Sequence, residues 1–203
     1  MEIKRLANNA LNFGINRTID IIGMSIVVIG VLLLISLASF SPDDPNFIFP
    51  ENTEIKNILN LRGSFTADLF FQSFGIISHL VPFSLIFIGI NVILSKKLLS
   101  IIESFFYVTL YLLIGSLFLT IFYSNSFILY INGNGGFVGK YLESTFLNSI
   151  ININLQVFYY LLVAITLTFF LLSIQFKINS FYIFVKKVFS LLFIRKKAVY
   201  ILC

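Results

Sequence analysis

Two ionisable residues, Asp68 and His79, lie at the start of and inside a long apolar run of the sequence. Ionisable groups within a membrane are candidates for proton transfer, because placing them in lipid is costly. They belong to a series of polar and small residues spaced 4, 3, 4, 3 and 7 apart, which is typical of one face of a helix. The series consists of Asp68, Gln72, Gly75, His79, Pro82 and Gly89.

This series has two interpretations. Membrane helices pack through small residues and keep polar side chains away from lipid, so the face can be buried against other helices or partner subunits. Alternatively, Asp68 and His79 relay protons or line the pathway of a small transporter or channel subunit. We favour helix packing for two reasons. Asp68 lies at the interface end of the run, and the one acidic residue in another span that could partner His79 is Asp20, which belongs near the opposite membrane face.

A glycine-rich stretch, Asn132 to Lys140 ("NGNGGFVGK"), superficially resembles a phosphate-binding loop. A Walker A loop needs Gly-Lys-Ser/Thr between a buried strand and a helix, whereas Tyr141 follows Lys140 here. We interpret the stretch as a flexible turn that leads into a short amphipathic segment in an external loop. A lipid-modifying membrane enzyme would need a polar constellation near a membrane face, which the sequence does not offer.

The sequence shows no nucleophile–base set, no paired carboxylates and no metal-ligand cluster, so we predict no enzyme activity, no cofactor and no metal. The single cysteine, Cys203, cannot form an internal disulfide.

The elements that position these residues follow from composition. The chain has 203 residues, of which 58% are hydrophobic, and its mean hydropathy is +0.97, which is too apolar for a water-soluble domain. Apolar runs of eighteen or more residues predict helices that cross a bilayer. We therefore predict an all-α integral membrane protein with four transmembrane helices, at about residues 19–40, 70–94, 101–123 and 157–174. We place Pro82 inside the second span, where neighbouring groups can satisfy the freed carbonyl.

Charge distribution predicts the orientation of these helices. Eleven of the 14 Lys and Arg residues lie in the arm 1–18, in the 95–100 turn or in the tail after Ile174. Lys and Arg accumulate on the cytoplasmic side, so both termini should face the cytoplasm. The tail 175–203 is predicted to form a basic amphipathic helix, or the start of a linker, that lies on anionic lipid, with DNA contact as the competing idea. The cations expected to contact the lipid surface are Lys186, Lys187, Arg195, Lys196 and Lys197.

The first span is followed by Ser41-Pro42-Asp43-Asp44-Pro45. Each proline disfavours helical geometry at the residue before it, and Asp with Pro favours a tight turn, so the helix should stop here.

The order of residues from this turn onward resembles the N-terminal four-helix (4TM) membrane domain of FtsK/SpoIIIE-type bacterial DNA translocases, over about residues 20 to 175. The matching positions are Ser41, Pro42, Asp44, Pro45, Asn57, Gly63, Ser64, Ala67, Asp68, Phe74, Gly75 and Pro82. The stretch with Gly135, Gly136 and Gly139 is similar to the family's Gly-Gly-x-x-Gly after its third span.

The resemblance implies a function that the residues alone do not. FtsK-type proteins join such a domain, through a linker, to a cytoplasmic motor that forms hexamers and pumps DNA through the division septum. This sequence would then anchor and target a translocase that acts in cell division and chromosome segregation, at the septum of the bacterial inner membrane. Its implied partners are membrane lipids, other division-site proteins and further copies of itself, with DNA reached only through the motor. The motor is absent from these residues, so either the chain is a fragment of a longer protein or the motor is encoded elsewhere; the abrupt end at "AVYILC" slightly favours a fragment.

Overall fold

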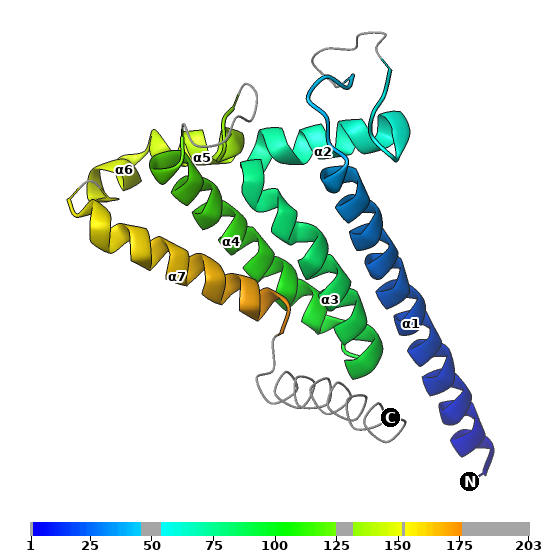
Figure 1. Ribbon diagram of the computed structural model, residues 1–203. Coiled ribbons are helices and arrows are strands. Elements are labelled where there is room, and N and C mark those ends of the chain that lie inside the picture. The colour runs from blue at the N-terminus through cyan, green and yellow to red at the C-terminus, as the bar shows by residue number, and fades with distance from the viewer. Residues whose placement is uncertain (1, 46–53, 125–131, 152, 176–203) are drawn as a thin grey trace, which may run out of the picture.

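The computed structural model describes residues 2–45, 54–124, 132–151 and 153–175, and the elements in these ranges are all helical (Figure 1). The prediction of an all-α protein is confirmed. In chain order the elements are α1 (Glu2–Ala38), α2 (Asn60–Phe74), the 3-10 helix η1 (Gly75–His79), α3 (Leu80–Ser95), α4 (Leu99–Phe122), α5 (Gly136–Glu143), α6 (Phe146–Ile151) and α7 (Leu155–Ser173).

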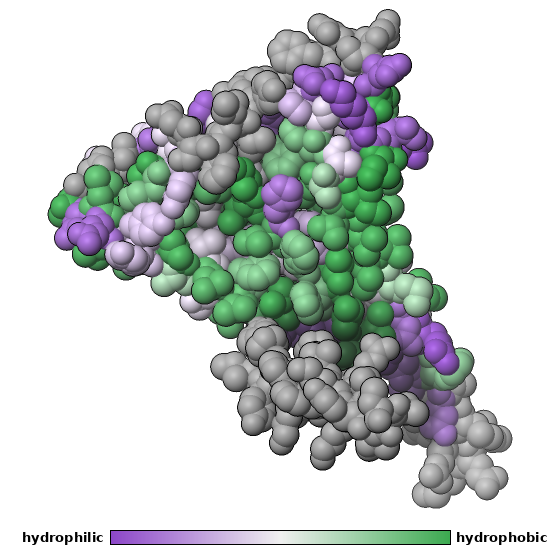
Figure 2. Space-filling view, in the orientation of Figure 1, coloured by the Kyte–Doolittle hydropathy of each residue, from purple (hydrophilic) through white to green (hydrophobic). Residues whose placement is uncertain are grey.

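Four segments are long and apolar enough to cross a membrane: Leu11–Ala38, Asn60–Ser95, Leu99–Phe122 and Leu155–Ser173. The protein is therefore a multi-pass membrane protein with four spans, as predicted. Large apolar side chains are exposed on its surface, which is favourable in lipid and unfavourable in water. Figure 2 shows this surface as a broad hydrophobic region over the middle of the bundle.

The second segment is divided, which differs from the continuous helix expected over 70–94. Here α2 runs across the end of α1 instead of continuing the direction of α3 (Figure 1). The break occurs at Gly75, whose φ of +71° lies in the left-handed region that ends a right-handed helix. The five residues of η1 and the 16 of α3 together rise about 34 Å, enough for a bilayer core of about 30 Å.

Pro82 lies inside the span formed by η1 and α3, as expected. It is the third residue of α3, in the first turn of that helix. An N–H at this position has no partner within the helix, so the proline removes no hydrogen bond of α3.

Close approach of glycines joins α1 to α3. A Cβ placed on Gly89 would lie 2.5 Å from the carbonyl oxygen of Gly23, and one on Gly23 would lie 2.9 Å from that of Gly89. Gly30 lies equally close to Ile86 on α3, one heptad further along α1. Small residues thus let the two helix backbones meet, as is common between membrane helices.

Polar side chains join α7 to α3 and α4. Ser84 Oγ is 3.1 Å from the Tyr111 hydroxyl and 3.0 Å from Ser173 Oγ, and all three residues are buried. Near the end of the described chain, Asn91 Nδ2 donates to the carbonyl oxygen of Ile174 at 2.9 Å. These bonds fix the last turn of α7 against the bundle.

The two ends of the bundle differ. At one end, Lys96 in the α3–α4 turn forms an ion pair with Asp20 of α1, and we call this end the Lys96 side. The other end carries α2, α5 and α6, and we call it the α2 side. Helix α1 begins and α7 ends on the Lys96 side, as four crossings require. The predicted amphipathic tail, with Lys186, Lys187 and the cations at 195–197, lies outside the described residues.

Candidate functional site

The chain turns sharply after α1 on the α2 side. Helix α1 ends at Ala38, just before Ser41 and Pro42, and the Asp44 N–H donates to the Ser41 carbonyl at 3.2 Å. The helix therefore stops where the two prolines predict. The turn brings Asp44 and Pro45 inward, so that Asp44 is only 4% exposed although it is charged.

The buried Asp44 carboxylate holds the backbone of the segment that leads into α2. One oxygen accepts the Lys56 N–H at 2.8 Å, and the other accepts the Asn57 N–H at 2.9 Å. The neighbouring Asp43 is exposed, and its carboxylate pairs with the Lys56 ammonium at 2.9 Å. This hydrogen bond and the charge of Asp43 raise the pKa of Lys56 above its ordinary value.

Asn57 in turn binds the last turn of α1. Its side-chain amide donates to the carbonyl oxygens of Ser36 at 2.9 Å and Ser39 at 3.3 Å, and its oxygen accepts the Leu59 N–H at 3.0 Å. This amide therefore satisfies carbonyls that the end of a helix leaves without intrahelical partners. An Asn at this position suits the task because it both donates and accepts.

Helix α2 is fixed to the same cluster by two serines. Ser36 Oγ donates to the Gly63 carbonyl at 2.6 Å, and Ser64 Oγ donates to the Pro45 carbonyl at 2.7 Å. A Cβ on Gly63 would collide with the Asn57 side chain, so the glycine is required for this approach. We call Ser36, Asp44, Asn57, Gly63 and Ser64 the polar joint; each of the five is buried.

The other end of α2 is held by glycines. The Ile76 N–H donates to the Asn134 carbonyl at 2.9 Å, directly beside Gly75. Gly136 approaches the Ser73 carbonyl so closely that an added Cβ would lie 2.6 Å from its oxygen. Ser116 of α4 donates to the Phe74 carbonyl at 2.9 Å. The residues Gly75, Asn134, Gly135, Gly136 and Gly139, with Ser116 and Thr120 of α4, form what we call the glycine joint.

The resemblance-based residues thus divide between these two joints. Asp44, Pro45, Asn57, Gly63 and Ser64 lie at the polar joint, with Ser41 and Pro42 in the turn above it. Phe74, Gly75, Gly135, Gly136 and Gly139 lie at the glycine joint. Ala67 and Asp68 are on the buried face of α2 between the joints.

The single polar face expected from Asp68 to Gly89 does not form, because the chain changes direction at Gly75. Asp68 accepts a 3.4 Å hydrogen bond from Gln72, whose amide oxygen accepts one from Asn132 at 3.2 Å. His79 is exposed, and the centroid of its ring lies 5.1 Å from that of Phe71 on α2. Gly89 lies in the α1–α3 contact. Among the described residues, no hydrogen bond or ion pair joins Asp68 to His79, and a polar pathway through the two stays an alternative prediction.

Catalytic arrangements are not found in the part of the chain that the structure describes. No three His, Cys, Asp or Glu side chains come together there in a way that could hold a metal ion. The "NGNGGFVGK" stretch leads into α5, and three of its glycines, Gly135, Gly136 and Gly139, lie against α4 or the Gly75 region. Lys140 is exposed on α5. The segment expected to be amphipathic forms α5 and α6, and α5 exposes Phe137 while burying Gly139.

Sequence reasoning missed several members of the two joints. Ser36 stands in the apolar stretch "LLLISLASF", and Ser116 and Thr120 stand in another, so they were not distinguished from background. Asn134 is 1% exposed and donates to the Tyr123 carbonyl, while its side-chain oxygen has no hydrogen-bond partner among the described residues. A useful signal would have been the isolated serines and threonines themselves, because a hydroxyl inside a span needs an acceptor.

Taken together, the two joints fix a helix across the end of a membrane bundle, with α2 attached at one end to α1 and at the other to α4 and α5. The sequence model of the family described as the 4TM region of DNA translocase FtsK/SpoIIIE matches residues 16–184. No curated protein and no solved structure gives a significant match to the chain.

Proposed function

The chain belongs to the family of the 4TM region of FtsK/SpoIIIE DNA translocases, and on this premise we propose that it anchors such a translocase in the bacterial inner membrane and targets it to the division septum. The family match covers the membrane region and not an ATPase motor. The proposed role is therefore attachment and assembly, in support of cell division and chromosome segregation, rather than catalysis by these residues.

The polar joint is the observation that supports this proposal most directly. Residues that match the family pattern form the hydrogen bonds that hold α2 across the end of the bundle. We infer that they produce a rigid surface and not a reaction site. A rigid surface suits recognition, because little conformational entropy is lost when a partner binds to it. We propose that the α2 side is where division-site proteins bind.

The distribution of Lys and Arg supports an orientation with the α2 side outside the cytoplasm. The α2 side carries three cations, Lys56, Arg62 and Lys140. The opposite side of the described chain carries five, which are Lys96 and Lys97 together with Lys4, Arg5 and Arg17 in the first half of α1. We propose that the cytoplasmic ends lead towards the motor, through which DNA contact and assembly into hexamers would occur.

A fluorescent fusion of the chain tests the targeting in dividing bacteria. We expect fluorescence at midcell for the natural sequence and for Asp43→Asn, whose carboxylate is exposed. Asp44→Asn, which weakens the polar joint, should reduce the midcell signal while the protein remains in the membrane. Uniform membrane fluorescence of the natural sequence would refute septum targeting.

Cysteine labelling with a membrane-impermeant reagent tests the orientation. In a chain whose natural cysteine is removed by Cys203→Ser, Asp43→Cys is expected to react in intact cells and Lys97→Cys only after the membrane is opened. The reverse pattern would refute the proposed orientation. Since Asp43 and Lys97 are both exposed, differences in labelling report the side of the membrane and not burial.

A further inference from the structure

An apolar groove of about 440 Å³ lies below α2, between α1 and α3. Its walls include Ile29, Leu32 and Leu33 of α1 and Leu85 of α3, and α2 forms its roof with Phe70. The volume is within the range of about 300 to 1,000 Å³ that is usual for small-molecule sites. The groove is open to the side of the bundle, where a bilayer would surround it.

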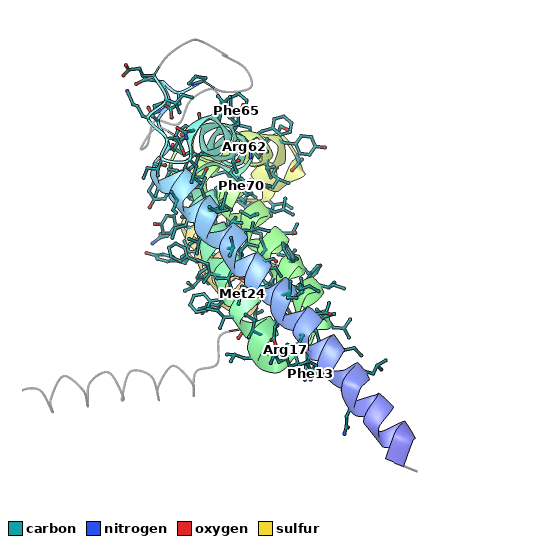
Figure 3. All side chains as sticks on the ribbon, turned by 90° about the vertical axis from the view of Figure 1, so that its right-hand side faces the viewer. Phe13, Arg17, Met24, Arg62, Phe65 and Phe70 are labelled. Atoms are coloured by element: carbon teal, nitrogen blue, oxygen red, sulfur yellow. The ribbon has the colours of Figure 1, made fainter. Side chains whose placement is uncertain are left out.

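One cation, Arg62, stands at the roof of this groove. In Figure 3, Arg62 and Phe70 lie near the upper end of α1, whereas Arg17 lies well below them along the same helix. Within the described part of the chain, the three ion pairs involve other cations, and the guanidinium of Arg62 has no hydrogen-bond acceptor. An arginine at a membrane surface that has no bound anion is able to bind one, because its planar guanidinium can donate two parallel hydrogen bonds to a phosphate or carboxylate group.

The other polar side chains of the groove are already satisfied. Ser36 Oγ donates to the Gly63 carbonyl at 2.6 Å, and Thr66 Oγ1 donates to the Arg62 carbonyl at 2.7 Å. Their donors therefore do not call for a polar ligand inside the groove. The site combines an apolar slot with a single unpaired cation at its rim, which is the chemistry of a fatty-acyl chain joined to an anionic head.

We propose that this groove binds one phospholipid, with an acyl chain between α1 and α3 and the phosphate on the Arg62 guanidinium. Charge complementarity favours this occupant over a transmembrane helix from a second copy. A helix is about 10 Å wide, and laying one along α1 would cover the guanidinium with apolar side chains and give it no anion. A phospholipid fills the apolar slot and neutralises the arginine at the same time.

Native mass spectrometry of the full chain, delipidated in detergent and then incubated with one lipid at a time, tests this proposal. The lipids are phosphatidylglycerol, phosphatidylethanolamine and diacylglycerol with the same acyl chains, so that only the head differs. We expect one tightly retained molecule of either phospholipid and none of diacylglycerol. Arg62→Ala should bind phosphatidylglycerol about tenfold more weakly or worse, and Arg62→Lys should fall between them.

Two further variants separate the groove from general charge effects. Thr66→Trp fills the groove from an exposed position and should also abolish retention, whereas Lys140→Ala removes another cation of the α2 side and should leave it unchanged. Thermal unfolding of each variant checks that the fold is intact. The proposal is overturned if folded Arg62→Ala retains lipid like the natural chain, if diacylglycerol binds equally well, or if Arg62→Ala alters only self-association.

Discussion

Replacing Asp44 by asparagine tests the polar joint with the smallest possible change in shape. The carboxylate accepts two backbone N–H groups, from Lys56 at 2.8 Å and from Asn57 at 2.9 Å. The two N–H groups bind different oxygens of the carboxylate, and an asparagine in the same position has oxygen at only one of these two sites, so one N–H loses its acceptor. The asparagine NH₂ group would face that N–H, and two donors do not bond.

The magnitude follows from these two bonds. A bond to a charged acceptor contributes about 1.5–3 kcal/mol and a neutral one about 0.5–1.5 kcal/mol, so the retained bond weakens by about 1 kcal/mol. The second N–H becomes a buried unsatisfied donor, which costs about 1–3 kcal/mol. We expect the free energy of opening the joint to fall by about 3 kcal/mol. At about 1.4 kcal/mol for each factor of ten, this corresponds to about 100-fold more frequent opening.

Hydrogen–deuterium exchange in lipid nanodiscs measures that opening at the amides concerned. Peptides that contain Lys56 and Asn57 should exchange about 100-fold faster in Asp44→Asn, while peptides from α3 keep their rates. Asp43→Asn is the matched control, because Asp43 is the adjacent residue, has the same chemistry and is exposed. Equal acceleration by Asp43→Asn and Asp44→Asn would refute the assignment of the joint to the buried carboxylate, as would no acceleration by either.

Three further substitutions probe the packing. Gly75→Ala should lower the free energy of unfolding by more than twice as much as Gly133→Ala does. Both glycines have a positive φ, at which adding a Cβ costs about 1–2 kcal/mol, but only at Gly75 would the Cβ also collide with backbone atoms. Thermal unfolding in detergent measures both, and equal losses would contradict the glycine joint. Gly89→Leu should separate α1 from α3 in spin-label distance measurements, whereas Gly14→Leu, with open space around it, should not; an unchanged distance in Gly89→Leu would exclude the close contact. Ser84→Ala should cost about 1 kcal/mol of stability, the usual size for a hydrogen bond between membrane helices, and a neutral effect would show that its two hydroxyl partners find others.

The four spans could be predicted from composition because bilayer thickness sets a minimum apolar length that few other structures need. The stop after α1 could be predicted as well, since Pro42 and Pro45 restrict the backbone locally. Both properties depend on residues that are close together in the sequence. They need no knowledge of what a residue contacts.

The direction change at Gly75 was harder to predict, because apolar residues continue on both sides of it. The spacing of Asp68 and His79 suggested one face only on the assumption of a single helix, and that assumption fails at a glycine with positive φ. The length of the segment held a usable hint, since Asn60–Ser95 has 36 residues and a span needs about 20.

Partners across the joints could not be predicted from pattern. Asp44 binds backbone groups 12 and 13 residues away, and backbone donors carry no sequence signature. The resemblance identified Asp44 and Asn57 as a set without saying which atoms they bind. The role of Ser36 could not be predicted either, because the carbonyl that accepts its hydrogen bond lies 27 residues later in the sequence.

Helix α1 has 37 residues, about 55 Å along its axis, and is uninterrupted from its first described residue to the polar joint. A continuous helix has no hinge at the membrane surface, so a force applied at its N-terminal end is transmitted along its axis. The force is shared between the α1–α3 contact at Gly23 and Gly30 and the polar joint, where Ser36 and Ser39 are bonded to Gly63 and Asn57. The hydrogen bonds of the polar joint act in parallel, so they must break together before α1 can move along its axis relative to α2.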